Sequence, residues 1–165
     1  MERAKRVVGY VAKFKSAALR FRVSVPDYSN LSAKVGNWKK AVYGNDHEEF
    51  PHNMLNLLGK INRITEFVDA NLYFDLVTGR ACAGLLIFLN QTPIDWYCKK
   101  QSTVACATFG SEFVAAKTAT EKAYDLCYTL PMMGIPVDYE SFVFGDNLAV
   151  ITQSTIPPSL ARKAS

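Results

Sequence analysis

The stretch RITEFVD, residues 63–69, decides the expected fold because it reads as a β-strand that ends in an acid, Asp69. A second strand-like stretch, YESFVFGD at residues 139–146, also ends in an acid, Asp146. Between them the longest helical pattern of the chain opens with a third acid, Glu112. A right-handed strand–helix–strand crossover returns the second strand parallel to the first. The sequence therefore predicts that the three acids meet at the carboxyl edge of one sheet, where open α/β sheets bind ligands.

The pattern between these strands predicts a meander followed by a helix. Residues 81–90, ACAGLLIFLN, are typical of a buried strand, and a turn leads to a third strand at residues 94–98. Because the first three strands are close in sequence, an antiparallel arrangement is expected. In the helix expected over residues 111–130, apolar residues recur at helical spacing and should form the stripe that faces inward. The stripe begins four residues after Glu112 and consists of Ala116, Ala119, Ala123, Leu126 and Leu130. A short helix over residues 147–153 completes an α/β fold with a mixed sheet.

The first 60 residues follow a different pattern. Residues 1–15 suit an amphipathic helix, residues 17–25 alternate like a strand, and residues 30–60 predict a connection with short irregular elements. Residues 1–22 carry seven basic side chains against one acid, Glu2. Such one-sided charge favours a polyanion as partner, although a solvated helix face has the same composition.

Composition limits the class of protein. The chain has 165 residues, 49% of them apolar, and a net charge of +4, which suits one domain with an appendage. No apolar run approaches the ~20 residues that span a bilayer, and the charged start does not resemble a signal peptide. We therefore expect no membrane partner and an intracellular location, cytoplasmic or nuclear. The cysteines form no C-x-x-C pair and are expected to be buried free thiols: Cys82, Cys98, Cys106 and Cys127.

Three carboxylates at one edge predict a divalent cation site. Acids a few ångströms apart repel strongly unless cations neutralise them, and Mg²⁺ is a hard ion that prefers oxygen ligands. Two such ions about 4 Å apart can activate a water and stabilise the leaving oxygen of a phosphodiester. Each acid also has an ordinary alternative. Asp69 could begin a turn, Asp146 could cap the following helix, and Glu112 could favour a helix N-terminus.

Several segments carry motifs in a consistent order and spacing. Residues 95–105, DWYCKKQSTVA, resemble W-x-S-K-K-Q-x-x-V-A, and residues 111–115, SEFVA, are similar to A-E-Y-x-A. Residues 67–71, FVDAN, resemble x-x-D-A-D/N, and residues 145–147, GDN, resemble x-D-N. On these motifs the chain resembles copia-type LTR-retrotransposon polyproteins. The resemblance covers their ribonuclease H domain and, in residues 1–25, the end of the preceding reverse transcriptase.

The resemblance implies a ribonuclease H-like fold and, in the intact parent, hydrolysis of the RNA strand of RNA–DNA hybrids during reverse transcription. It implies that Asp69, Glu112 and Asp146 are three of the family's four catalytic, metal-binding acids. Asp69 and Asp146 would bridge two Mg²⁺ ions, or Mn²⁺ in their place, and Glu112 would hold one of them. An inactive nucleic-acid-binding remnant, or a fragment without an independent role, remains open as an alternative.

The resemblance also implies how the chain is divided. Residues 1–60 would be a basic connection segment from the end of a reverse transcriptase, and residues 61–165 a truncated ribonuclease H-like domain. The family's fifth strand, final helix and fourth acid do not follow in this sequence, so an incomplete C-terminus, an open sheet edge at the fourth strand and poor cleavage are expected. The remainder of the reverse-transcriptase polyprotein is an expected partner.

Basic residues near the expected site suggest contacts to an RNA–DNA hybrid or another nucleic acid duplex. Lys99, Lys100 and Gln101 follow the third strand and could hold phosphates, although a solvated loop is equally expected there. The basic N-terminal helix could support the duplex through Arg3, Lys5, Arg6, Lys13 and Lys15. Phosphate contacts of this kind set affinity and register but not sequence preference.

Overall fold

The computed structural model describes residues 5, 9, 12–14, 16, 21–34, 50–138 and 140–155. Its regular elements are β1 (Ile64–Asp75), β2 (Arg80–Leu89), β3 (Thr92–Lys100), α3 (Thr108–Met132), β4 (Phe142–Phe144) and α4 (Leu148–Thr155). The predicted order of three strands, a helix, a strand and a helix is confirmed. Most of the predicted helix at residues 1–15 lies outside the described residues, although Lys5, Gly9, Ala12 and Lys13 are helical.

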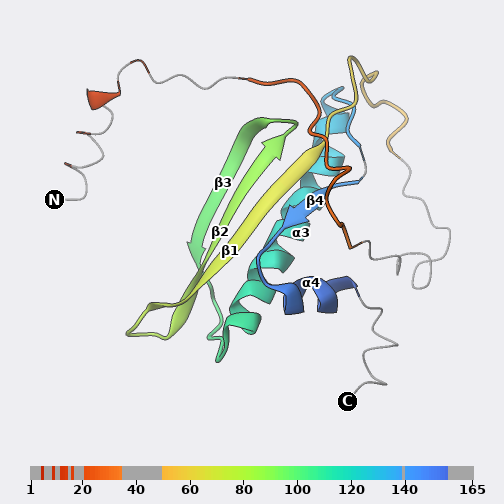
Figure 1. Ribbon diagram of the computed structural model, residues 1–165. Helices are drawn as coiled ribbons and strands as arrows, with labels where there is room; N and C mark the ends of the chain where they lie inside the picture. Colours follow the sequence, from red (N-terminus) through yellow and green to blue (C-terminus); the bar gives the residue numbers. More distant parts are fainter. Residues whose placement is uncertain are drawn as a thin grey trace.

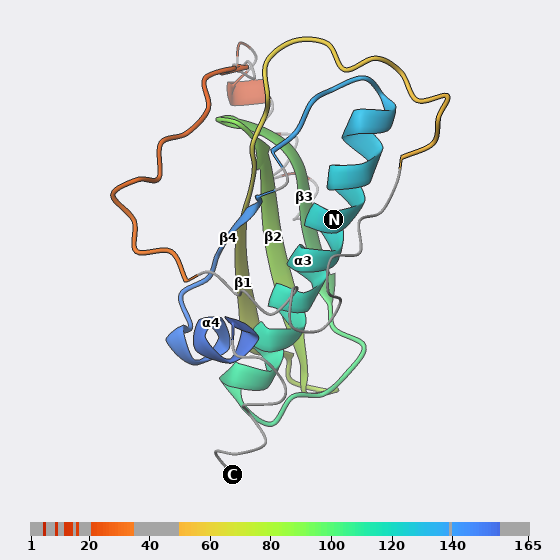
Figure 2. The same cartoon turned by 90° about the vertical axis from the view of Figure 1, so that its right-hand side faces the viewer.

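The four strands form one sheet in the order β3-β2-β1-β4. β1 and β3 both pair with β2 in antiparallel fashion, and β4 pairs with β1 in parallel. Figure 1 shows these strands side by side, and Figure 2 shows α3 lying along one face of the sheet with α4 near its first turns. The predicted mixed sheet is therefore confirmed, and β4 pairs only with β1 within the described residues.

Small side chains allow α3 to lie close against the sheet. Its buried line runs at four-residue spacing through Ser111, Ala115, Ala119 and Ala123. These residues face a core that includes Ile64, Leu85 and Ile87. The predicted inward stripe is confirmed at Ala119, Ala123 and Leu130, which are buried. It was wrong at Ala116, which is only partly buried, whereas its neighbour Ala115 is buried. Glu112 borders the buried face of α3.

β1 is longer than predicted. It continues past Asp69 to Asp75, because β2 continues to pair with it, with Asn71 opposite Cys82 and Asp75 opposite Arg80. The parallel pairing with β4, however, ends where Phe67 lies opposite Phe144. Asp69 and Asp146 each lie two residues beyond that last pair. The prediction that β1 ends at Asp69 is wrong, but Asp69 lies just beyond the point where β1 stops pairing with β4.

The predicted strand at residues 17–25 is absent from its described part, residues 21–25. The main chain there bonds to side chains at the end of the sheet. Arg22 donates its N–H to Thr92 Oγ1 at 2.7 Å, and Asn90 Nδ2 donates to the carbonyl of Val23 at 3.2 Å. The described part of the N-terminal segment thus contacts the sheet without extending its ladder.

Two further expectations concern the surface. The cysteines were expected to be buried, but Cys98 and Cys106 are exposed and Cys82 and Cys127 are only partly covered. All four are free thiols. Among the described residues, no helix combines the length and the apolar character needed to cross a membrane.

Candidate three-acid site

Two of the predicted site acids are positioned by the parallel strand pair. Because β1 and β4 run in the same direction, Asp69 and Asp146 leave the last paired residues at the same edge of the sheet. Asp69 is exposed, and its Oδ1 accepts a hydrogen bond from the N–H of Ala70 at 2.8 Å. One of its oxygens is therefore held by the adjacent backbone, and the other is available to a ligand.

Glu112 approaches this edge from α3. The helix begins at Thr108 and has no acid in its first turn, so Glu112 does not serve the helix N-terminus as the alternative reading proposed. Partial burial raises the pKa of Glu112, and the negative charge of Asp146 raises it further. A hydrogen bond from Asn147 lowers this pKa, whereas a hydrogen bond with Asp146 and the charge of Asp69 raise it. The three acids therefore lie within electrostatic range of one another.

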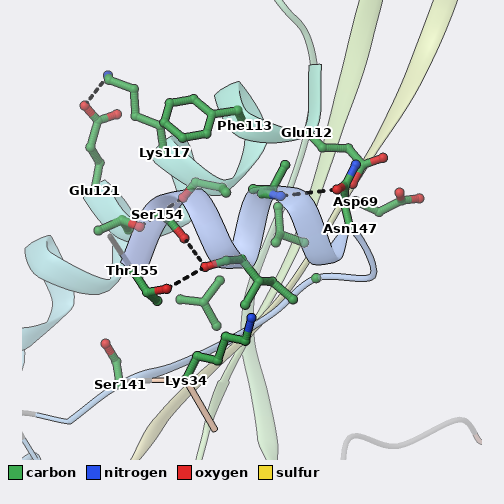
Figure 3. Close-up of a pocket in the computed structure, with 17 residues that line it drawn as sticks. Lys34, Asp69, Glu112, Phe113, Lys117, Glu121, Ser141, Asn147, Ser154 and Thr155 are labelled. Carbon is green, nitrogen blue, oxygen red and sulfur yellow. Dashed lines mark hydrogen bonds and ion pairs between the residues drawn. The ribbon is translucent and has the colours of Figure 1, made fainter. Parts of the chain in front are cut away.

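Asn147 leaves Asp146 free to take part in this site. The Oδ1 atom of Asn147 accepts the N–H groups of Ala149 and Val150 at 3.0 and 3.2 Å. Asn147 is therefore the N-cap of α4, and the alternative role of Asp146 as that cap is wrong. Figure 3 shows Asn147, Glu112 and Asp69 together at the N-terminal end of α4.

Two of the three acids, Asp69 and Glu112, line a cleft of about 560 Å³ between α3, α4 and β4. Asp69 and Glu112 lie at one end of it, and Lys117 and Glu121 lie toward the other (Figure 3). Its apolar lining is Val68, Phe113, Ala116, Val143, Val150 and Ile151. Lys34 also lines the cleft and donates its Nζ to Thr152 Oγ1 at 2.7 Å. The cleft thus joins the end with Asp69 and Glu112 to an end that carries the Lys117–Glu121 ion pair and the hydroxyl groups of Ser154 and Thr155.

The donor set fits Mg²⁺ or Mn²⁺ in its chemistry. Carboxylate oxygens are the ligands that hard divalent cations prefer, and the mutual repulsion that raises the pKa of Glu112 is the kind that a cation relieves. The side chains are not grouped in advance, however. In the part of the chain that the structure describes, no three histidine, cysteine, aspartate or glutamate side chains form a group that could hold a metal ion. Binding would therefore require the carboxylates to rotate toward a common point.

The predicted nucleic-acid contacts separate into three groups. Lys99 is exposed at the end of β3, and Lys5 and Lys13 are also exposed. Lys100 forms an ion pair with Asp75 at 2.7 Å, which together with a hydrogen bond from Thr78 lowers the pKa of Asp75. The positions of Arg3, Arg6 and Lys15 lie outside the described residues.

Gln101 does not fit the predicted role of a phosphate contact. It is buried, and its Nε2 donates to the carbonyl of Ser111 at 2.7 Å. Its own N–H donates to the carbonyl of Ala81 at 2.8 Å. The side chain of Gln101 joins the end of β3 to the start of α3 and is not presented to a phosphate.

Two residues of this region were missed in the sequence. Asn147 stands directly before a helical pattern, and asparagine at that position is a usual N-cap signal. The sequence could therefore have indicated Asn147, rather than Asp146, as the N-cap. Glu66 lies two residues from both Ile64 and Val68, so the period of a strand places it on their buried face. It is 0% exposed, and neither carboxylate oxygen has a hydrogen-bond partner among the described residues.

Fold and site together define a mixed α/β domain with an acid-ended cleft beside a parallel strand pair. Comparison of the chain with protein-family models, with curated proteins and with solved structures found no significant match.

Proposed function

We propose that this chain is the ribonuclease H-type module of a copia-type retrotransposon polyprotein. In this proposal it has a ribonuclease H-like fold and hydrolyses the RNA strand of RNA–DNA hybrids with the help of divalent cations. The observation that carries the proposal is that three separate acids lie within electrostatic range of one another. Asp146 and Asp69 both raise the pKa of Glu112, although the three residues come from different elements.

Each acid has a distinct part in the proposed reaction. Asp69 and Asp146 lie beyond the ends of the parallel pair and would hold the cations together with Glu112 from α3. When bound, the cations supply an activated water and stabilise the leaving oxygen of the phosphodiester. The raised pKa of Glu112 means that cation binding competes with a proton at this carboxylate. We therefore expect binding to strengthen as pH rises.

The substrate would lie across the edge of the sheet that carries the acids, with its phosphates near exposed lysine side chains. Lys99 is exposed and forms no ion pair with a described residue, whereas Lys100 is paired with Asp75. Lys5 and Lys13 add exposed positive charge in the N-terminal segment. The remainder of a reverse-transcriptase polyprotein is the proposed covalent or non-covalent partner that would deliver the hybrid.

The test is cleavage of a hybrid labelled separately on its RNA and DNA strands, with Mg²⁺ or Mn²⁺. We expect slow cleavage of the RNA strand alone, since the carboxylates are not grouped in advance. Replacement of Asp69 or Asp146 by Asn, or of Glu112 by Gln, should reduce the rate by about a hundredfold or more, because even indirect supports of a metal ligand change activity 10- to 100-fold. Asp125→Asn is a matched control, as Asp125 is exposed on the same helix as Glu112.

A second candidate function is nucleic-acid binding without catalysis. The absence of a ready metal-binding group among the described residues favours it. In that case the chain would bind the hybrid with an affinity that falls linearly with log salt, no strand would be cut, and Asp69→Asn would leave binding unchanged. Cleavage that persists at full rate in Asp69→Asn would contradict both candidates, because it would come from a different site or a contaminant.

A further inference from the structure

Two thiols lie close together on the sheet face opposite α3. The Sγ atoms of Cys82 in β2 and Cys98 in β3 are 3.5 Å apart. In β2 the buried residues Ala81 and Ala83 face the helix side, so the strand period places Cys82 on the other face. Cys98 is exposed there, opposite Gly84. The pair is therefore reachable from solvent.

We propose that Cys82 and Cys98 form a binding site for a thiophilic centre that accepts two sulfur bonds, either a soft metal ion or a trivalent arsenical. A metal–sulfur bond is about 2.3 Å long for zinc. With both sulfurs at that distance and 3.5 Å from each other, the S–metal–S angle is about 100°, close to a tetrahedral angle. The two thiols thus span such a centre with little movement, and water or a further ligand would complete its coordination.

The same register disfavours a direct disulfide. Cys98 lies opposite Gly84 and Cys82 lies opposite Lys100, so the two cysteines are diagonal neighbours in the antiparallel ladder. Diagonal Cα atoms are about 7–8 Å apart, whereas disulfides join Cα atoms about 4.4–6.8 Å apart. A bridging atom between the sulfurs supplies the missing length without displacement of the backbone.

Binding of a metal ion to the two cysteines depends on pH, because thiols must lose their protons to become metal ligands. Burial raises the pKa of the Cys82 thiol, and the neighbouring Cys98 raises it further. The Cys82 thiol therefore holds its proton more tightly than a free thiol does, and a metal ion that binds both sulfurs must displace their protons to solvent. The affinity for a metal ion should consequently rise with pH. No electron transfer is involved, because two S–H bonds are replaced by two sulfur–metal bonds.

The surroundings leave room for a group attached to the bound centre. A shallow hollow of about 320 Å³ adjoins Cys98 and is lined by Phe67, Leu86 and Trp96 around Gly84. Glycine at position 84 leaves this space open between Cys98 and Asp69, which lie on either side of it in the sheet. The phenyl ring of phenylarsine oxide would rest on these apolar side chains while arsenic bonds both sulfurs.

The first probe is Cd²⁺, added to the reduced 165-residue chain. Binding should produce the ultraviolet charge-transfer band of cadmium–thiolate bonds at one equivalent and should weaken as pH is lowered. Cys82→Ser and Cys98→Ser should each abolish the one-equivalent step, whereas Cys106→Ser, which removes another exposed thiol, should retain it. Retention of the step in Cys82→Ser or Cys98→Ser, or its loss in Cys106→Ser, would overturn the proposal.

The second probe separates a close pair from independent thiols. Phenylarsine oxide should bind one molecule per chain, and its oxygen should leave as water with the two thiol protons. Maleimide labelling after this treatment should show two fewer reactive thiols, restored by a small dithiol such as dimercaptopropanol. A chain that folds, as judged by circular dichroism, but loses no thiols to phenylarsine oxide would refute the site.

Discussion

Glu66 should make this fold less stable as pH rises, and Glu66→Gln tests that dependence. The side chain is 0% exposed and neither of its oxygens has a hydrogen-bond partner among the described residues. Burial raises its pKa from 4.5 to about 8, opposed by the positive charge of Lys122 on α3. The folded state therefore holds the Glu66 proton more tightly than the unfolded state does.

The sign and size of the effect follow from this difference. Below pH 4.5 both states are protonated, so the full stability is present. As pH rises toward about 8, the unfolded state ionises first and stability is lost at up to about 1.4 kcal/mol for each pH unit. From the ordinary value of 4.5 to pH 7 the loss amounts to about 3 kcal/mol, and above about 8 it levels off.

The assay is urea unfolding of both proteins at a series of pH values from 4.5 to 9. Gln has the shape of Glu but cannot ionise, so the gain in unfolding free energy of Glu66→Gln over the original chain should grow by about 3 kcal/mol between pH 4.5 and 7. The other titratable groups in electrostatic contact with this region are Cys127, on which Glu66 acts, and Asp138, which also acts on Cys127. The substitution leaves Asp138 in place but removes the negative charge of Glu66 that raises the pKa of Cys127.

Glu121→Gln is the matched control. Glu121 lies on the same helix as Lys122, its side chain is 61% exposed, and it pairs with Lys117. Such exposed pairs contribute about 0–1 kcal/mol, so its pH dependence should follow that of the original chain. If Glu66→Gln also followed the original chain at every pH, the carboxyl group would be solvated or paired, and the reasoning would be refuted.

Three other expectations follow from local geometry. Asn147→Ala removes the N-cap of α4 and should cost about 1 kcal/mol in urea unfolding; it should also raise the pKa of Glu112 in a carboxyl titration by NMR, because Asn147 lowers it. Gly134→Ala should cost about 1–2 kcal/mol, because Gly134 has a φ of +80° and an added Cβ would lie 3.2 Å from the carbonyl oxygen of Asn56; an unchanged urea midpoint would contradict this. Lys99→Gln should flatten the log–log salt dependence of duplex binding by about 0.9, whereas the same change at Lys100, which is paired with Asp75, should have a smaller effect.

The element order could be predicted because its signals are local. Strand-like runs, a long helical period and two turns give three strands, a helix, a strand and a helix without reference to any distant contact. The parallel return of β4 beside β1 follows from the handedness of the crossover. For the same reason the placement of Asp69 and Asp146 at the same edge of the sheet could be predicted, since it depends on the direction of the strands rather than on their exact length.

The predictions were wrong where contacts with a distant part of the chain determine the local structure. The end of β1 lies at Asp75 rather than Asp69 because β2 continues to pair with it. The alternation of residues 17–25 resembles a strand, but the described residues from Phe21 onward bond to side chains such as Thr92 instead of a neighbouring strand. Most of the predicted inward stripe of α3 is confirmed, but it included Ala116 where Ala115 is the buried residue, because these neighbouring alanines are alike in character. Only packing against the sheet distinguishes them.

The two acids of β1 show why position in the sheet decides what a carboxylate can do. Glu66 and Asp69 are three residues apart, so the strand period places them on opposite faces. Glu66 lies within the stretch that β4 covers, opposite Val143, and is enclosed under α3. Asp69 lies beyond that stretch, where the sheet edge opens onto the cleft and the charges of Glu112 and Asp146 are near. A cation can therefore relieve the repulsion at Asp69, whereas at Glu66 only a proton can neutralise the charge. The opposite faces of the strand and the short length of β4, which ends at Phe144, together separate a buried acid from a candidate catalytic one.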